Sequence, residues 1–248
     1  PAQRGTSPDL AGRWSLVSSY RDQTLTATER LTARVRQLLD RYGVITREVV
    51  QAEETEGGFA AVYGVLRAME EAGRVRRGYF VAGRGAAQFA LPGAVDRLRT
   101  LREPDPDAQP KIVVLAATDP ANPYGAALGW GERGEGRKPM RSAGALVVLI
   151  DGVLAAWLAK DRPSSSGSRA VPWGERALLT FTEEEETDAA RTRALIAKAL
   201  AAEAARSHGA PFFIDEVDGQ PIDESPMAEP LREAGFARTP RGYLKRSA

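Results

Sequence analysis

The chain has 248 residues, of which 43% are apolar and 27% are charged, and its formal net charge is +1. This composition is typical of a folded protein with one large domain or two ordinary ones. The absence of cysteine and the single histidine exclude disulfides, thiolate metal sites, cysteine nucleophiles and His-pair metal motifs. Because the bulk charge is nearly balanced, binding to nucleic acid would require local basic patches.

We expect no signal peptide at the start of the chain. Residues 1–23 lack an initiator Met and are typical of a linker that leads into a short strand at residues 13–17. This pattern fits a piece of a longer protein, and also a removed Met or a tag. No apolar run approaches the length of a membrane span, so we expect a cytoplasmic protein with no membrane partner.

The first strong helix signal covers residues 24–43. Thr26 and Glu29 have the spacing of a capping box, and an apolar stripe follows on one helical face. A short second helix begins within residues 45–50, with Thr46 as its N-cap, and a turn follows at residues 53–58.

The third helix is followed at once by an arginine-rich hairpin. Apolar residues recur at helical spacing from Phe59, and Gly73 ends the helix. We expect strands at residues 79–82 and 88–91 around a glycine-containing loop. A fourth helix, at residues 94–101, is predicted to pack behind the hairpin through Val95, Leu98 and Leu101. Residues 24–103 therefore predict a winged helix-turn-helix.

Positive charge gathers on this predicted wing. The arginines on or beside it, which could reach phosphates, are Arg74, Arg76, Arg77 and Arg84. The third helix exposes mostly small residues, and Arg67 is the one long donor in its middle. We therefore expect contacts to the nucleic-acid backbone and shape, without a base code. The alternative is that the winged helix packs against protein and the arginines form a solvated face.

A second domain is expected after an acidic, proline-rich linker at residues 104–110. Within residues 111–248 we predict strands at 111–117, 144–150, 153–159, 177–181 and 212–217, with helices at 188–207 and 225–234. The Asp151-Gly152 pair predicts a tight hairpin. The expected fold is α+β: a winged helix followed by an antiparallel β-barrel-like domain with helices. No residue set predicts a metal site.

Two aspartates of this domain are candidate catalytic carboxylates. Asp119 follows a predicted buried strand, within a rigid Asp-Pro-x-Asn-Pro-Tyr turn where Asn122 and Tyr124 are close in sequence. Asp151 is the second candidate. Both also have a purely structural interpretation, because Asp is a common turn former.

The last predicted hairpin, at residues 236–246, is also basic. Arg238, Arg241 and Lys245 alternate with Phe236 and Tyr243, and cations beside aromatic rings suit single-stranded nucleic acid. An ordinary terminal strand pair with charged edges explains the same pattern.

Long strings of the chain resemble the C-terminal part of large helicase-related (Lhr) proteins. They are GGFAAVYGVLRAMEEAGRVRRGYFVAGRGAAQFALPGAVDRLR, TDPANPYG followed by Trp130, the hairpin at Asp151-Gly152, and EVDGQP with LREAGFARTPRGYLKR. The resemblance runs in order from Trp14 onward. Arg84 departs from it, since an apolar residue is expected there in many relatives.

The resemblance implies a place in an ATP-dependent superfamily 2 helicase of DNA repair, which translocates 3′–5′ on single-stranded DNA and unwinds RNA–DNA hybrids. It implies motor domains of the same parent as partners, a role in homo-oligomer assembly, and ATP and Mg as cofactors of that motor. It also implies similarity to winged-helix DNA glycosylases, with uracil excision attributed to the family. The glutamine-x-glutamine pattern expected of the crosslink-unhooking relatives is absent, since Gln88, Gln109 and Gln220 stand alone.

This chain contains no G-x-x-x-x-G-K-[ST] phosphate loop, so we expect no cofactor in it. Two functions follow as hypotheses. The favoured one is a nucleic-acid-binding and assembly module, and the alternative is a glycosylase that uses a carboxylate such as Asp119.

Overall fold

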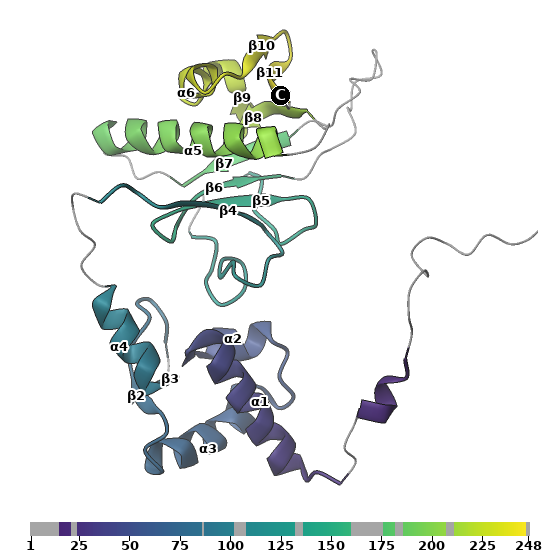
Figure 1. Cartoon of the computed structure of the whole chain (residues 1–248), viewed down its shortest axis with the longest axis vertical. Helices are drawn as coiled ribbons and strands as arrows, with labels where there is room; N and C mark the ends of the chain where they lie inside the picture. The colour runs from purple at the N-terminus through teal and green to yellow at the C-terminus, as the bar shows by residue number, and fades with distance from the viewer. Residues whose placement is uncertain are drawn as a thin grey trace, which may run out of the picture. The chain divides into compact units, whose positions relative to one another are not determined.

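The computed structural model describes eight stretches of the chain: residues 15–20, 24–85, 87–101, 108–131, 136–159, 176–181, 186–206 and 211–246. The chain divides into two compact units, residues 1–99 and 100–248 (Figure 1). The strand predicted at residues 13–17 is wrong in its described part, because Val17–Tyr20 form the 3₁₀-helix η2. Leu16 and Val17 are exposed, and no described strand pairs with them to make a ladder. Residues 13 and 14 lie outside the described stretches.

Unit 1 is a helical layer with a small sheet. Its helices are α1 (Ala27–Tyr42), α2 (Arg47–Ala52), α3 (Gly58–Glu71) and α4 (Pro92–Thr100). Its strands are β1 (Val44–Ile45), β2 (Arg76–Gly78) and β3 (Gln88–Ala90), and both ladders are antiparallel, in the order β1-β3-β2. The helix starts follow the sequence, since Thr26 and Glu29 form the predicted capping box and Thr46 caps α2.

The core of unit 1 lies between α1, α3 and β3. The buried side chains of this cluster are Val35, Leu38, Leu39, Ile45, Val50, Val62, Leu66, Val75 and Phe89. The apolar stripes predicted for the first and third helices thus face each other. Each is helical because its apolar residues recur at three- and four-residue spacing, which places them on one side.

Two details of the predicted wing are wrong. The outgoing strand is Arg76–Gly78, and residues 79–82 belong to the loop instead. Helix α4 buries Val95, but Leu98 and Leu101 are exposed. Residues 96–101 are all exposed, so only the first half of α4 packs against unit 1.

Unit 2 contains a sheet with one long helix and one short helix. The strands are β4 (Ile112–Ala116), β5 (Leu146–Ile150), β6 (Val153–Leu158), β7 (Arg176–Thr180), β8 (Phe212–Val217), β9 (Gln220–Pro221), β10 (Ala237–Thr239) and β11 (Gly242–Lys245). The helices are α5 (Glu186–Arg206), the 3₁₀-helix η3 (Ile222–Glu224) and α6 (Ala228–Glu233). The Asp151-Gly152 hairpin is confirmed: both residues have positive φ, as a type I′ turn requires.

The sheet of unit 2 is open. Its strand order is β10-β11-β8-β7-β6-β5-β4, with β9 paired to β8, so the described strands leave β10 and β4 as edges. The predicted barrel closure is therefore not found in the described residues. The prediction of a wholly antiparallel sheet is wrong, because β7 and β8 pair in parallel. Such a pair needs a long crossover between its strands, and α5 lies in that connection.

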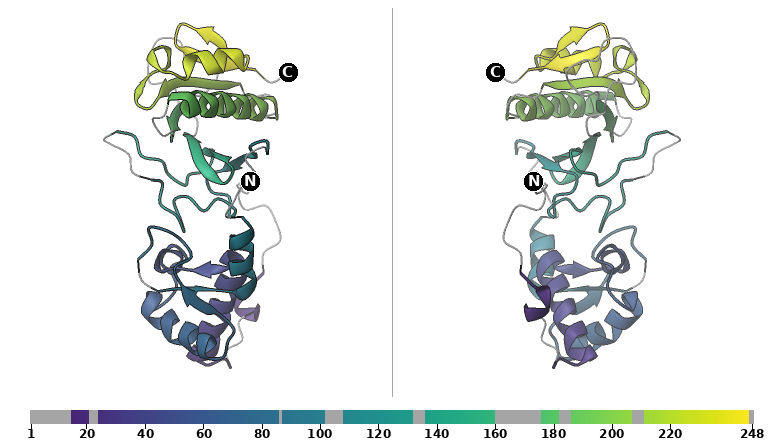
Figure 2. Two further views of the ribbon diagram at one scale, coloured as in Figure 1. Left: turned by 90° about the vertical axis from the view of Figure 1, so that its left-hand side faces the viewer. Right: turned by 90° about the vertical axis from the view of Figure 1, so that its right-hand side faces the viewer.

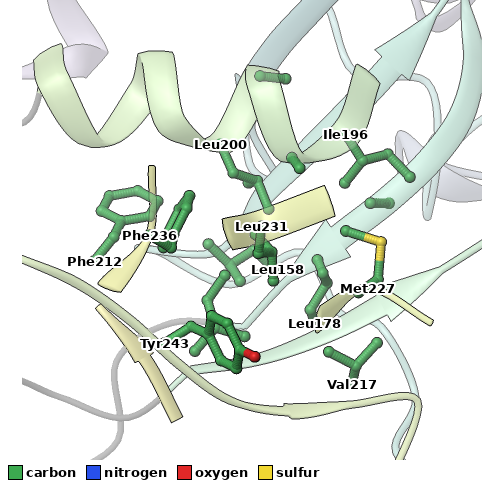
Figure 3. Close-up of a cluster of buried hydrophobic side chains, with 14 of the residues drawn as sticks. Leu158, Leu178, Ile196, Leu200, Phe212, Val217, Met227, Leu231, Phe236 and Tyr243 are labelled. Atoms are coloured by element: carbon green, nitrogen blue, oxygen red, sulfur yellow. The ribbon is translucent and has the colours of Figure 1, made fainter. Parts of the chain in front are cut away.

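Both faces of this sheet are covered. On one face, α5 and α6 pack over residues that include Leu158, Leu178 and Tyr243 (Figures 2 and 3). On the other, the side chains of Val147, Trp157 and Leu179 pack with Tyr124 and Trp130 from the long β4–β5 connection. This connection therefore acts as the second covering layer of the sheet.

Candidate nucleic-acid interface

The exposed stripe of α3 carries mostly small residues. It consists of Ala60, Gly64, Arg67, Ala68 and Glu71. Arg67 Nε donates to Glu71 Oε1 at 3.0 Å, one turn further along the helix. The single long donor predicted on this helix is thus paired with a carboxylate, and the stripe holds no Asn or Gln that could read a base edge.

Arg74 and Arg76 are the free cations of the wing region. Both are exposed, and neither side chain has a hydrogen-bond or ion-pair partner among the described residues. Arg77 differs, because its guanidinium lies 3.3 Å from Glu70 Oε1 and 3.5 Å from the Tyr63 hydroxyl. An unpaired guanidinium can bind a phosphate without first breaking an ion pair within the protein.

Arg84 is tied electrostatically to the second helix. Burial would raise the pKa of Glu48, but the Thr46 side chain, the backbone amide of Glu48 and the charges of Arg84 and Arg47 outweigh it and hold that pKa below its usual value. The four predicted wing arginines therefore separate into two free ones and two that already interact within unit 1.

A buried glutamine holds the wing loop. Gln88 is fully buried, and its Oε1 accepts from the backbone N–H groups of Phe80 and Val81, each at 2.8 Å. Its Nε2 donates to the carbonyls of Val81 at 3.0 Å and Arg84 at 3.3 Å. One side chain thus takes the place of the missing strand ladder at residues 79–82. Sequence reasoning missed it, because a glutamine inside an apolar strand carries no periodic signal.

The basic residues of the terminal hairpin are engaged differently. Arg238 Nη2 donates to Asp223 Oδ2 at 3.1 Å, and Lys245 Nζ donates to the Ala234 carbonyl at 3.0 Å. Arg241 is exposed, and its backbone N–H donates to Thr239 Oγ1. The structure does not relate these residues to the wing, because the two units are separate bodies.

The aromatic half of that hairpin prediction is wrong. Phe236 and Tyr243 are only 3% and 2% exposed, and both point into the cluster under α5 and α6 (Figure 3). Their rings are used for packing and cannot stack on a base. Tyr243 lies in β11, where Gly242, Tyr243 and Leu244 are all buried, so its ring belongs to the core of unit 2.

Asp119 lies in a tightly anchored loop directly after β4. Its Oδ1 accepts from the Ala121 N–H at 2.8 Å, which is the predicted structural turn, while its Oδ2 has no hydrogen-bond partner among the described residues. The side chain is half-buried. Asn122 is almost fully buried and braces the loop from inside, donating from Nδ2 to the Ala117 carbonyl at 2.9 Å.

Arg141 anchors the same loop from outside. Its Nη1 donates to the carbonyls of Asn122 and Tyr124 at 2.7 and 3.2 Å. Its Nη2 donates to the carbonyls of Asp119 and Thr118 at 3.1 and 3.4 Å. Sequence reasoning missed Arg141, because the acceptors are backbone carbonyls some twenty residues away and leave no mark in side-chain pattern.

The loop also requires a glycine at one position. Gly125 has φ +75°, and a Cβ placed on it would lie 2.3 Å from the Trp130 ring. The indole therefore rests directly on the backbone of this residue. Tyr124 reaches the hairpin turn, since its hydroxyl donates to the Gly152 carbonyl at 3.2 Å.

Asp151 and Asp119 are not brought together. Asp151 Oδ1 accepts from the N–H of Lys111 at 2.8 Å, just before β4, whereas the Asp119 N–H bonds to Ala116 at the other end of that strand. A five-residue strand is roughly 16 Å long. The two carboxylates thus cannot act as a pair. No group of three or more metal-ligating side chains occurs in the described part of the chain.

Comparisons with known proteins agree with the winged helix of unit 1. A profile of the family described as "Large helicase-related protein, winged-helix domain" matches residues 24–110. The Lhr helicase/probable uracil glycosylase of Mycolicibacterium smegmatis is 41% identical over 250 residues, covering 98% of this chain. The Lhr helicase/uracil glycosylase of Escherichia coli is 38% identical over 237 residues, covering 95% of this chain. This chain belongs to the large helicase-related (Lhr) family.

The resemblance to the C-terminal region of Lhr proteins is therefore confirmed. The chain spans 15% of the length of the M. smegmatis relative and 14% of that from E. coli. Its winged helix is the part that the Lhr profile matches. Within the described stretches of this Lhr chain, no helix is both long enough and apolar enough to cross a membrane.

Proposed function

We propose that this chain is the C-terminal nucleic-acid-binding and assembly module of an Lhr-type ATP-dependent helicase that acts in DNA repair in the cytoplasm. Its partners are single-stranded DNA or an RNA–DNA hybrid, the motor domains of the parent, and further copies of the chain. ATP and Mg belong to that motor, and this chain itself carries no cofactor. The observation that carries the proposal is the pair Arg74 and Arg76 beside the wing of a winged helix, which have no partner within the described part of the chain.

The interaction is electrostatic and only weakly dependent on sequence. The exposed stripe of α3 can approach a nucleic-acid backbone closely, because a Cβ added at Gly64 would meet nothing within 4 Å. It offers no side chain for base edges apart from Arg67, which Glu71 already holds. The arginines therefore contribute to affinity through phosphates, and this contribution falls as salt rises.

The test compares two double variants of the whole chain. Replacing Arg74 and Arg76 by Ala is expected to weaken binding to single-stranded DNA and to reduce the salt slope of the affinity by about 1.4, since each phosphate contact contributes about 0.7. Fluorescence anisotropy with a labelled oligonucleotide over a range of NaCl concentrations measures both. The matched control replaces Arg191 and Lys198, which are exposed cations on α5.

If both double variants bind single-stranded DNA with the affinity and the salt slope of the unmodified chain, the wing does not bind phosphates and this role is overturned. The control removes the same charge from the other unit, so a nonspecific effect of net charge would appear in both variants. Arg77→Ala is expected to weaken binding less than Arg76→Ala, because Glu70 and Tyr63 already engage the Arg77 guanidinium.

A second function rests on the Asp119 loop. Its free Oδ2 and its rigid anchoring by Arg141 and Asn122 give a carboxylate of defined position, and both relatives carry uracil glycosylase in their names. In such a reaction the base leaves C1′ of a flipped-out nucleotide with the bonding electron pair. Water attacks C1′, and the carboxylate accepts the proton of that water.

The decisive measurement is incubation of this chain without ATP with uracil-containing DNA, followed by alkaline cleavage. If the Asp119 carboxylate is the general base, Asp119→Asn abolishes strand scission at uracil. DNA binding persists, because the amide oxygen still accepts from the Ala121 N–H and preserves the turn. Asp151→Asn is the matched control. Full scission by Asp119→Asn would exclude Asp119, and no scission by the unmodified chain would exclude this second function.

A further inference from the structure

The most exposed large apolar side chain in the described residues is an aromatic ring on the wing. Tyr79 is 87% exposed, directly after the end of β2. Its hydroxyl has no hydrogen-bond partner among those residues. At this exposure the ring makes little contact within unit 1 and is accessible to a flat partner outside it.

The backbone on both sides of Tyr79 is fixed. Gly78 pairs with Gln88 in the β2–β3 ladder, and the N–H of Phe80 donates to Gln88 Oε1 at 2.8 Å. The ring of Phe80 packs against Gly78, since a Cβ added there would lie 3.0 Å from Phe80 Cζ. Tyr79 is therefore displayed by an ordered backbone, which lowers the entropic cost of binding through its ring.

Two arginines lie near this ring along the chain. Arg76 and Arg77 precede Tyr79 by three and two residues, so their Cα atoms lie within about 10 Å of that of Tyr79. Arg74 and Arg76 have no partner among the described residues. An exposed ring that follows two unpaired guanidiniums along the chain suits a ligand that alternates flat bases with phosphates. A protein surface that only buried the ring would leave those cations unpaired.

We infer that Tyr79 stacks on an unpaired base, so that this wing prefers single-stranded nucleic acid to closed duplex. The inference rests on the proposed nucleic-acid role of unit 1 and refines it by naming the strand state and the contact. The arginines can bind phosphates of either form, but the ring can stack only where a base face is open. Duplex DNA keeps its base faces covered by neighbouring pairs.

The experiment measures the affinity of the whole chain for oligothymidylate and for a relaxed, covalently closed duplex circle. Tyr79→Ala is expected to weaken binding of the single strand by about 5- to 150-fold, the usual effect of losing one stacked base, and to leave duplex binding unchanged. Its salt slope stays that of the unmodified chain, because tyrosine carries no charge. Val153→Ala, which removes an exposed apolar residue of unit 2, serves as the control.

A spectroscopic readout separates stacking from simple apolar contact. With 2-aminopurine inside the oligothymidylate, stacking quenches its emission. Tyr79→Phe keeps both affinity and quenching, whereas Tyr79→Leu, although apolar, loses the quenching. Circular dichroism of each variant verifies that it is folded, and the exposure of Tyr79 leads us to expect no change there.

Failure of this inference can be told from failure of the proposed function. If the unmodified chain binds, and Arg74 and Arg76 carry that binding but Tyr79→Ala binds as well as the unmodified chain, only the stacking role is overturned. Equal losses on single strand and duplex also overturn it. It is also overturned if Tyr79→Ala changes the oligomeric mass in solution without changing DNA affinity. That result would assign Tyr79 to a contact between proteins. No binding by the unmodified chain overturns both.

Discussion

At the residue scale, Glu53 shows how one carboxylate joins the helices of unit 1. Its Oε1 accepts from the Tyr42 hydroxyl at 2.6 Å and from Arg41 Nη1 at 2.5 Å, and its Oε2 accepts from Arg34 at 2.8 Å. The Tyr42 hydrogen bond lowers the pKa of Glu53, burial opposes it, and the bonds and charges of Arg41 and Arg34 lower it further. The Glu53 carboxylate thus links α1 to the turn after α2.

This lowered pKa predicts an acid-sensitive unit 1. Because the folded pKa of Glu53 lies below its unfolded value of about 4.5, its contribution is fully present above that value and is lost as pH falls through the folded pKa. We expect Glu53→Gln to cost about 1–3 kcal/mol at pH 7 and to flatten the loss of stability below about pH 4.5. Hydrogen exchange of the α1 and α2 amides measures this. An unchanged pH profile in the variant would contradict the assignment.

At the element scale, the loop after β4 depends on Arg141. Its guanidinium donates to the carbonyls of Thr118, Asp119, Asn122 and Tyr124. We expect Arg141→Ala to cost about 1–3 kcal/mol and to raise the exchange rate of the amides at residues 119–124. Arg141→Lys is expected to restore only part of the lost stability, because an ammonium lacks the planar guanidinium geometry that reaches several carbonyls at once. Full protection of these amides in Arg141→Ala would show that Asn122 alone holds the loop.

At the scale of the whole molecule, the two units have separate buried cores. Leu66 is fully buried in unit 1 and Leu200 in unit 2. Leu66→Ala is expected to destabilise unit 1 by about 2–5 kcal/mol and to leave the exchange of α5 and β6 unchanged. Leu200→Ala should do the reverse. If either variant opened both units together, the chain would unfold as one cooperative body.

The sequence by itself determined those features that depend on neighbours along the chain. The Thr26 capping box, the stripes of α1 and α3, and the Asp151-Gly152 turn all follow from local spacing and local φ preferences. The order of three helices and a hairpin was sufficient to predict the winged helix, and the long Lhr-like strings were sufficient for the family.

Only the tertiary structure decided which polar and aromatic groups are free. Phe236 and Tyr79 are both aromatic residues beside arginines, yet one is buried and the other is exposed, because burial depends on elements distant in sequence. The same holds for Gln88 and Arg141, whose partners are backbone groups brought close by folding. The parallel β7–β8 pair likewise depends on where α5 packs. A local sequence pattern predicts that a strand forms, but it does not predict which strand pairs with it.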